Sequence, residues 1–128
     1  MFVEALTLDG IRAARQTFAT TALRERLARY HGDKTDALVA AWIETWLAPA
    51  FRDWNIEACL GAIRCPVLAM QGVHDEYGTP AQVDAIVRGV CTNATAWMVP
   101  AAGHTPHRDV PGAVLATVGP FIADALDR

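Results

Sequence analysis

The feature that most constrains the fold is a pair of short strand-like runs separated by one helix-length segment. Residues 67–70 (Val-Leu-Ala-Met) are wholly apolar, and residues 95–99 (Thr-Ala-Trp-Met-Val) form the second run. A wholly apolar run of this length is typical of a strand buried on both faces, as in a parallel sheet. Between the runs, Thr79 and Pro80 predict the start of a helix that reaches about Val90. The order strand, helix, strand therefore predicts two parallel strands.

A loop and a last helix are predicted after the second strand. Residues 100–108 read as the loop, and the helix starts at Asp109 or Val110 and reaches Leu126. Gly119 and Pro120 fall inside this helix. Because a proline in a helix interior removes one hydrogen bond and clashes with the preceding turn, at a cost of roughly 3 kcal/mol, a kink or break is expected near Thr117.

The first half of the chain has a different pattern, because residues 7–62 predict helices only. The chain is therefore expected to consist of a helical segment, residues 1–62, and a strand–helix–strand–helix segment, residues 63–128. This is an α/β fold class. Two parallel strands do not make a complete sheet alone, so the sheet is expected to be incomplete within this chain.

Length and composition exclude several classes of protein. The 128 residues are 52% hydrophobic and 20% charged, which fits one globular domain. The net charge of −3 argues against a nucleic-acid partner. The longest apolar run, residues 37–43, is too short to cross a membrane, and no signal peptide is expected at the start. Three cysteines without a Cys-x-x-Cys pair favour a reducing compartment, so a cytoplasmic location is predicted.

An ionisable residue follows each predicted strand. Asp75 lies in the loop after the first strand and His104 in the loop after the second, 29 residues later, which is one strand–helix unit. Open parallel sheets bind their ligands at the carboxyl ends of the strands. Adjacent strands would therefore bring Asp75 and His104 together at a ligand-binding edge.

These residues carry a resemblance to a known family. The run Pro-Val-Leu-Ala-Met-Gln-Gly-x-x-Asp, then a helix, a strand and Gly-His, resembles the last two strand–helix units of the α/β-hydrolases. The resemblance implies that Asp75 is the acid and His104 the base of a Ser-His-Asp triad. The helical segment before them resembles the cap of that family. The whole chain would then be a partial α/β-hydrolase fold, a helical cap segment followed by two parallel strand–helix units.

The third member of such a triad is missing from this chain, which contains no serine. The family places its nucleophile on a Gly-x-Ser-x-Gly turn ahead of the acid and the histidine. We therefore expect a C-terminal portion of a hydrolase that is inactive alone, so whether the chain is an enzyme by itself stays open. Completed by an N-terminal half, it would hydrolyse a carboxylic ester or a C–C bond of a small apolar substrate. The alternative is a non-catalytic remnant that binds a partner or itself through an exposed sheet edge.

Each candidate residue also has a simpler interpretation. Asp75 could cap a turn, and His104 could be a loop histidine without a task. A metal site from His74, Asp75, His104 and His107 is less favoured because Pro106 interrupts the histidine pair and no thiolate is near in sequence. No metal and no cofactor are expected.

Trp42 and Trp46 are the candidate substrate-binding residues. They are four positions apart, which places them on the same face of a predicted helix in the cap-like segment. In the functional interpretation they form an apolar lid over a hydrophobic substrate. Ordinary packing is the alternative, since aromatic residues at helical spacing usually belong to a core.

Overall fold

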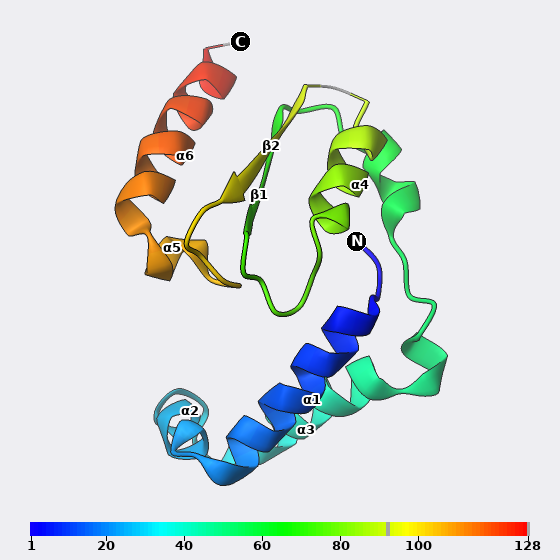
Figure 1. Ribbon diagram of the computed structural model, residues 1–128, viewed down its shortest axis with the longest axis vertical. Coiled ribbons are helices and arrows are strands. Elements are labelled where there is room, and N and C mark those ends of the chain that lie inside the picture. Colours follow the sequence, from blue (N-terminus) through cyan, green and yellow to red (C-terminus); the bar gives the residue numbers. More distant parts are fainter. Residues whose placement is uncertain (92, 128) are drawn as a thin grey trace. The chain divides into compact units, whose positions relative to one another are not determined.

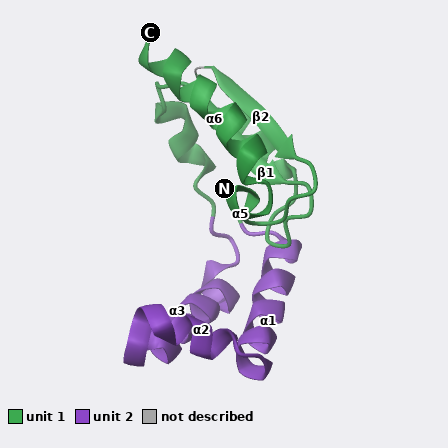
Figure 2. Ribbon diagram, turned by 90° about the vertical axis from the view of Figure 1, so that its left-hand side faces the viewer, with its two compact units in different colours: residues 1–2, 55–128 green, residues 3–54 purple. Residues whose placement is uncertain are grey.

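The chain forms two compact units (Figure 2). The structure, a computed structural model, describes residues 1–91 and 93–127. Residues 3–54 make up one unit, called here the helical unit. Residues 1–2 and 55–128 make up the other, called the strand unit. The segment 55–62 therefore belongs with the strands, whereas the sequence led us to place it with the helices.

Two parallel strands form the centre of the strand unit (Figure 1). β1 (Val67–Gly72) pairs with β2 (Ala94–Val99) in a register that places Val67 opposite Ala94 and Gly72 opposite Val99. Within the described residues the sheet consists of these two strands. Helix α4 (Ala81–Gly89) connects them, as the sequence predicts. Because the strands pair in register, their carboxyl ends lie at the same edge of the sheet.

Helix α4 and a short 3₁₀ helix build the core beside this sheet. α4 packs on both strands and buries Val83 and Ala85. The 3₁₀ helix η3 (Glu57–Ala62) packs on α4 through Leu60. A Cβ atom on Gly89 would lie 2.6 Å from Leu60 Cδ1, so the two helices approach closely because Gly89 has no side chain. This contact explains why the segment 55–62 belongs to the strand unit.

The start of the chain is also tied to the strand unit. Phe2 forms an isolated antiparallel bridge with Asn55. The buried side chain of Gln82, on α4, exchanges two hydrogen bonds with the Phe2 backbone. Its Oε1 accepts from the Phe2 N–H at 3.3 Å, and its Nε2 donates to the Phe2 carbonyl at 2.9 Å. Residues 80 positions apart in the sequence are thereby joined.

Two helices follow β2, and both differ from the sequence prediction. Residues 100–108 are not all loop, because the short helix α5 (Pro106–Asp109) begins at Pro106. Helix α6 (Pro111–Leu126) then continues through Pro120, so a break near Thr117 is wrong, whereas a kink there stays a prediction. Besides the clash with the preceding turn, a proline ring also clashes with the N–H and the Cβ of the residue before it. Gly119 has no Cβ, which removes that part of the conflict.

The helical unit consists of α1 (Ala5–Thr20), α2 (Leu23–His31) and α3 (Thr35–Leu47), with short 3₁₀ turns over Gly32–Lys34 and Pro49–Phe51. α1 packs on α3 and buries Leu8 and Ile11, while α3 buries Ile43. No helix in the described part of the chain has the length and apolar character needed to cross a membrane.

Candidate active site

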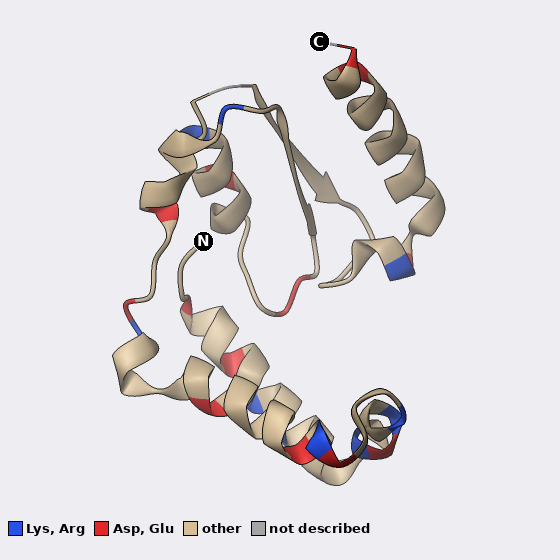
Figure 3. Cartoon of the chain, turned by 180° about the vertical axis from the view of Figure 1, so that it is seen from behind, with Lys and Arg blue, Asp and Glu red and all other residues tan. Residues whose placement is uncertain are grey.

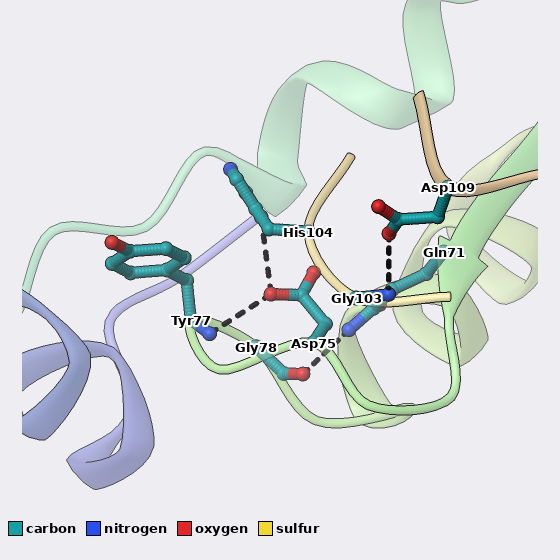
Figure 4. A network of polar contacts seen from close by, with 7 residues as sticks. All are labelled: Gln71, Asp75, Tyr77, Gly78, Gly103, His104 and Asp109. Carbon is teal, nitrogen blue, oxygen red and sulfur yellow. Dashed lines mark hydrogen bonds and ion pairs between the residues drawn. The ribbon is translucent and has the colours of Figure 1, made fainter. Parts of the chain in front are cut away.

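The structure brings the two sequence-predicted residues together. Asp75 follows β1 and His104 follows β2, and both loops leave the sheet at its carboxyl edge. His104 Nδ1 lies 3.0 Å from Asp75 Oδ1 (Figure 4). The side chain of Asp75 is only 10% exposed, whereas that of His104 is 54% exposed. A shielded carboxylate thus contacts an accessible imidazole.

A close approach of the two loops at Gly72 makes this contact possible. A Cβ atom on Gly72 would lie 2.1 Å from the carbonyl oxygen of Gly103 and 2.3 Å from that of Ala102. The loops are also joined by backbone hydrogen bonds, from His74 N–H to the Ala102 carbonyl at 2.9 Å among others. A glycine is therefore required at position 72, because any side chain there would force the loops apart. In the sequence, Gly72 stands out only as part of the family pattern.

The turn of the β2 loop has an unusual backbone conformation. Ala101 has a φ of +55°, in the left-handed region that non-glycine residues rarely adopt. It lies two residues before Gly103, at the point where the chain turns after β2. Strained residues of this kind persist where the surrounding structure holds them in place.

Asp75 also organises its own loop. Its Oδ1 accepts a hydrogen bond from the Tyr77 N–H at 2.9 Å, and its own N–H donates to the Gly72 carbonyl at 3.2 Å. The turn-capping interpretation of Asp75 therefore describes part of what this residue does. The same oxygen faces the imidazole, so one orientation of the Asp75 carboxylate serves both the turn and the contact with His104.

Tyr77 is a member of the site that the sequence analysis missed. Its ring meets that of His104 edge to face, with centroids 4.7 Å apart and an interplanar angle of 64°. Burial raises the pKa of the Tyr77 phenol, and the negative charges of Glu76 and Asp75 raise it further. A neutral phenol ring therefore packs beside the imidazole. In the sequence, only its position two residues after Asp75 could have indicated that Tyr77 belongs to the site.

Two further side chains hold the loops, one on each. Gln71, buried at the end of β1, donates from Nε2 to the Gly78 carbonyl at 2.5 Å. Asp109, on α5, accepts the Gly103 N–H on Oδ2 at 2.9 Å. Both bonds are drawn in Figure 4. The candidate pair is thus surrounded by hydrogen bonds that fix the backbone on both sides.

The geometry allows one clear form of acid–base chemistry. An ionised carboxylate can only accept hydrogen bonds, so the contact with Asp75 assigns the proton to His104 Nδ1. The other ring nitrogen, Nε2, points away from Asp75 (Figure 4). A neutral imidazole oriented in this way can take a proton on Nε2 from a nucleophile.

The other candidates lie elsewhere. His74 and His107 are exposed, His74 in the Asp75 loop and His107 on α5. Among the residues that the structure describes, no three His, Cys, Asp or Glu side chains are grouped so as to hold a metal ion.

The tryptophans that we named as substrate-binding candidates belong to α3, in the helical unit. Trp42 is 41% exposed. Trp46 packs edge to face against Phe51 and Trp54, at centroid distances of 5.3 and 5.6 Å. A role in binding substrate remains a prediction for both.

Comparison with known proteins supports the fold. No family model and no curated protein sequence matches the chain. Its structure is similar to the crystal structure of the proline iminopeptidase of Mycobacterium smegmatis, with a TM-score of 0.56 and 21% identity, covering 93% of this chain and 46% of that chain. It is also similar to the crystal structure of VinJ, with a TM-score of 0.57 and 23% identity, covering 93% and 47%. The chain spans less than half the length of either protein. It therefore has part of the α/β-hydrolase fold, which confirms the fold class expected from its sequence.

Proposed function

We propose that this chain contributes the acid and the base of a Ser-His-Asp hydrolase site, with Asp75 orienting His104. The observation that carries the proposal is the 3.0 Å contact between Asp75 Oδ1 and His104 Nδ1 at the carboxyl edge of two paired parallel strands. That edge is where open α/β sheets bind their ligands. The part of an α/β-hydrolase fold in this chain supports the same chemistry.

In the proposed mechanism His104 Nε2 takes the proton of a serine hydroxyl as the serine attacks the substrate. The imidazolium then gives that proton to the leaving group. Asp75 keeps the other proton on Nδ1 and stabilises the imidazolium charge. The exposures fit these roles, because the base is 54% exposed to an incoming group while the carboxylate is 10% exposed.

The serine would come from outside this chain, which has none. The chain corresponds to 46% and 47% of the two similar structures, which leaves more than half of that fold to supply a nucleophile turn. We therefore propose that the chain acts as the C-terminal portion of a hydrolase and is inactive alone.

The proposed substrate is a small apolar molecule with a carboxylic ester or a hydrolysable C–C bond. Trp42 and Trp46 are the proposed aromatic contacts for it, and the 41% exposure of Trp42 supports this role. The name of one similar structure, a proline iminopeptidase, adds a proline-containing peptide to the substrates to be tested.

Complementation tests the proposal. The chain is co-expressed with a polypeptide that carries the Gly-x-Ser-x-Gly half of the fold, and hydrolysis of p-nitrophenyl acetate is measured for each part and for the mixture. We expect activity in the mixture alone. His104→Ala should reduce it to background, and Asp75→Asn should reduce it about 10⁴-fold, as in other triads.

His107→Ala is the matched control, because His107 is an exposed histidine on α5, three residues after His104. It should leave the rate of hydrolysis unchanged. Activity that survives His104→Ala, or a mixture without activity, would contradict the proposal.

A non-catalytic binding role is the second candidate function. Three large apolar side chains on α6 favour it, because Leu115, Ile122 and Leu126 are exposed. This role predicts an association that depends on concentration and no hydrolysis in any mixture.

A further inference from the structure

We propose that Gln71 and Asp109 are positioning residues that set the geometry of the Asp75–His104 pair, each by fixing one of the two loops. The inference rests on the proposed function for its catalytic meaning. It goes beyond that function by assigning a role to two side chains that the chemistry itself does not use.

Gln71 closes the loop that carries Asp75. It is a polar residue at the end of a strand that is otherwise apolar, and it is 8% exposed. A buried amide costs free energy unless its hydrogen bonds are made. Its Nε2 donates to the Gly78 carbonyl at 2.5 Å, which joins the residue before the loop to the loop's far end. Asp75 lies near the middle of the segment closed by this bond (Figure 4).

Asp109 holds the loop that carries His104. Its Oδ2 accepts the Gly103 N–H at 2.9 Å, one residue before the histidine. Asp109 is itself held, because its N–H donates to the Thr105 carbonyl at 3.1 Å. A hydrogen bond to an ionised carboxylate is stronger than one between neutral groups. The backbone on both sides of His104 is therefore tied to α5.

Both side chains act through the backbone. Gln71 bonds a carbonyl oxygen and Asp109 bonds an N–H, on opposite loops. The imidazole is 54% exposed, so packing alone leaves it room to turn. Its distance from Asp75 thus depends on where the two loops hold their backbones. Misplacement of a catalytic group by about 1 Å can cost about 10²-fold in rate.

The test measures the protonation of the His104 imidazole in this chain alone, without any partner. Ring-nitrogen chemical shifts report which nitrogen of neutral His104 carries the proton, and His104→Ala assigns the signals. In the unchanged chain the proton should reside on Nδ1. Gln71→Met removes the donor at similar length, and it should shift part of the population from the Nδ1–H to the Nε2–H tautomer.

Gln82→Met is the matched control for Gln71. Gln82 is another buried glutamine of the strand unit, at 7% exposure, and its two bonds hold Phe2 rather than a site loop. Its loss should leave the His104 signals unchanged. Gln71→Met releases the backbone of a site loop, whereas Gln82→Met releases the backbone of Phe2.

A conservative pair of variants tests Asp109. Asp109→Ala removes the acceptor for the Gly103 N–H and should shift the His104 proton population. Asp109→Asn keeps an acceptor oxygen and should restore it. Because Asp109 is exposed, neither change leaves a cavity in the core. This pair decides the proposal if Gln71→Met fails to fold.

The outcomes separate this proposal from the proposed function. If Asp75→Ala, which removes the acceptor, shifts the His104 proton while Gln71→Met and Asp109→Ala do not, the positioning roles are overturned and the acid–base pair stands. If Asp75→Ala itself has no effect, the pair and the proposed function fail together. In the complemented enzyme, each positioning variant should lower kcat about 10- to 100-fold with KM little changed.

Discussion

At the residue scale, one carboxylate oxygen makes two of the contacts that shape the site. Asp75 Oδ1 accepts the Tyr77 N–H and faces His104 Nδ1, so the turn that shapes the loop also aims the acid. Tyr77 adds its ring to the imidazole's surroundings. Gly72 lets the two loops come within contact of each other. These four residues act together, and the Tyr77 ring and Gly72 contribute through packing.

The ionisation of Tyr77 should depend on the fold. Burial and the nearby carboxylates raise its pKa above the ordinary value, so the folded chain holds the phenolic proton more tightly than the unfolded chain does. The free energy of unfolding should therefore be unaffected below the pKa of the unfolded chain and fall as pH rises through the folded pKa. Ultraviolet titration of tyrosinate in a Tyr30→Phe background isolates Tyr77, since these are the two tyrosines.

Glu76→Gln provides the control for that titration. It removes one of the charges that raise the pKa of Tyr77, so the titration should move part of the way back while burial still holds it high. A folded chain whose Tyr77 ionises at or below the pH found in denaturant would refute the prediction.

Gly72→Ala should destabilise the chain by roughly 1–3 kcal/mol, the usual cost of overpacking. The new methyl group would meet the Gly103 and Ala102 carbonyl oxygens, which are backbone atoms and cannot turn aside. Urea unfolding measures the change. Gly112→Ala is the control, because nothing lies within 4 Å of its Cβ position, and it should be neutral or slightly stabilising. Equal effects of the two substitutions would disprove the steric account.

At the element scale, α6 shows how one small residue keeps a helix continuous. Pro120 lies inside a helix of 16 residues that runs from Pro111 to Leu126. The residue before a proline avoids helical geometry chiefly through its Cβ and N–H, and Gly119 has no Cβ. Gly119 and Pro120 would each weaken a helix alone, and together they weaken it by less than the sum of their separate costs.

Alanine substitutions at these two positions should be strongly coupled. Pro120→Ala restores a backbone donor and should stabilise α6 by up to roughly 3 kcal/mol. Gly119→Ala should bring little or no gain beside Pro120, although its Cβ position is open, but about 0.5–1 kcal/mol in the Pro120→Ala background. Thermal unfolding of the unchanged chain, the two single variants and the double variant, monitored by circular dichroism, gives the double-mutant cycle. Additive effects would show that Gly119 has no special role.

At the scale of the whole molecule, the chain exposes apolar surface on α6. Figure 3 shows that α6 carries charge only toward its C-terminal end, and Asp124 is the only charged residue within it. Leu115 is 72% exposed, and Ile122 and Leu126 follow it at spacings that place all three on one face. A two-stranded parallel sheet likewise leaves strand edges unpaired within the described residues.

Replacing the exposed face of α6 should improve solubility without loss of stability. Leu115→Gln with Ile122→Gln should lower the binding of a hydrophobic dye and raise the concentration at which the chain stays monomeric, as light scattering would show. The unfolding free energy should change by about 0.5 kcal/mol or less per site, as for other surface positions. Val114→Gln, at a buried neighbour, should instead cost roughly 1–3 kcal/mol. An unfolded double variant would refute the assignment of this face to solvent.

The sequence by itself determined the strand–helix–strand pattern and the two residues after the strands. The spacing of apolar residues, the helix-start signals and the apolar runs are local properties of the sequence. They predict β1, α4 and β2 without knowledge of distant contacts. The family order of glycine, acid and histidine then singles out Asp75 and His104, which the structure brings to 3.0 Å.

Tertiary structure alone decided what depends on contacts between distant residues. The packing of Leu60 against Gly89 assigns the segment 55–62 to the strand unit. The approach of Gly72 to Gly103 and the contact of the Tyr77 ring with His104 join residues from two separate loops. No local pattern encodes these meetings, because they arise only when paired strands carry both loops to one edge of the sheet.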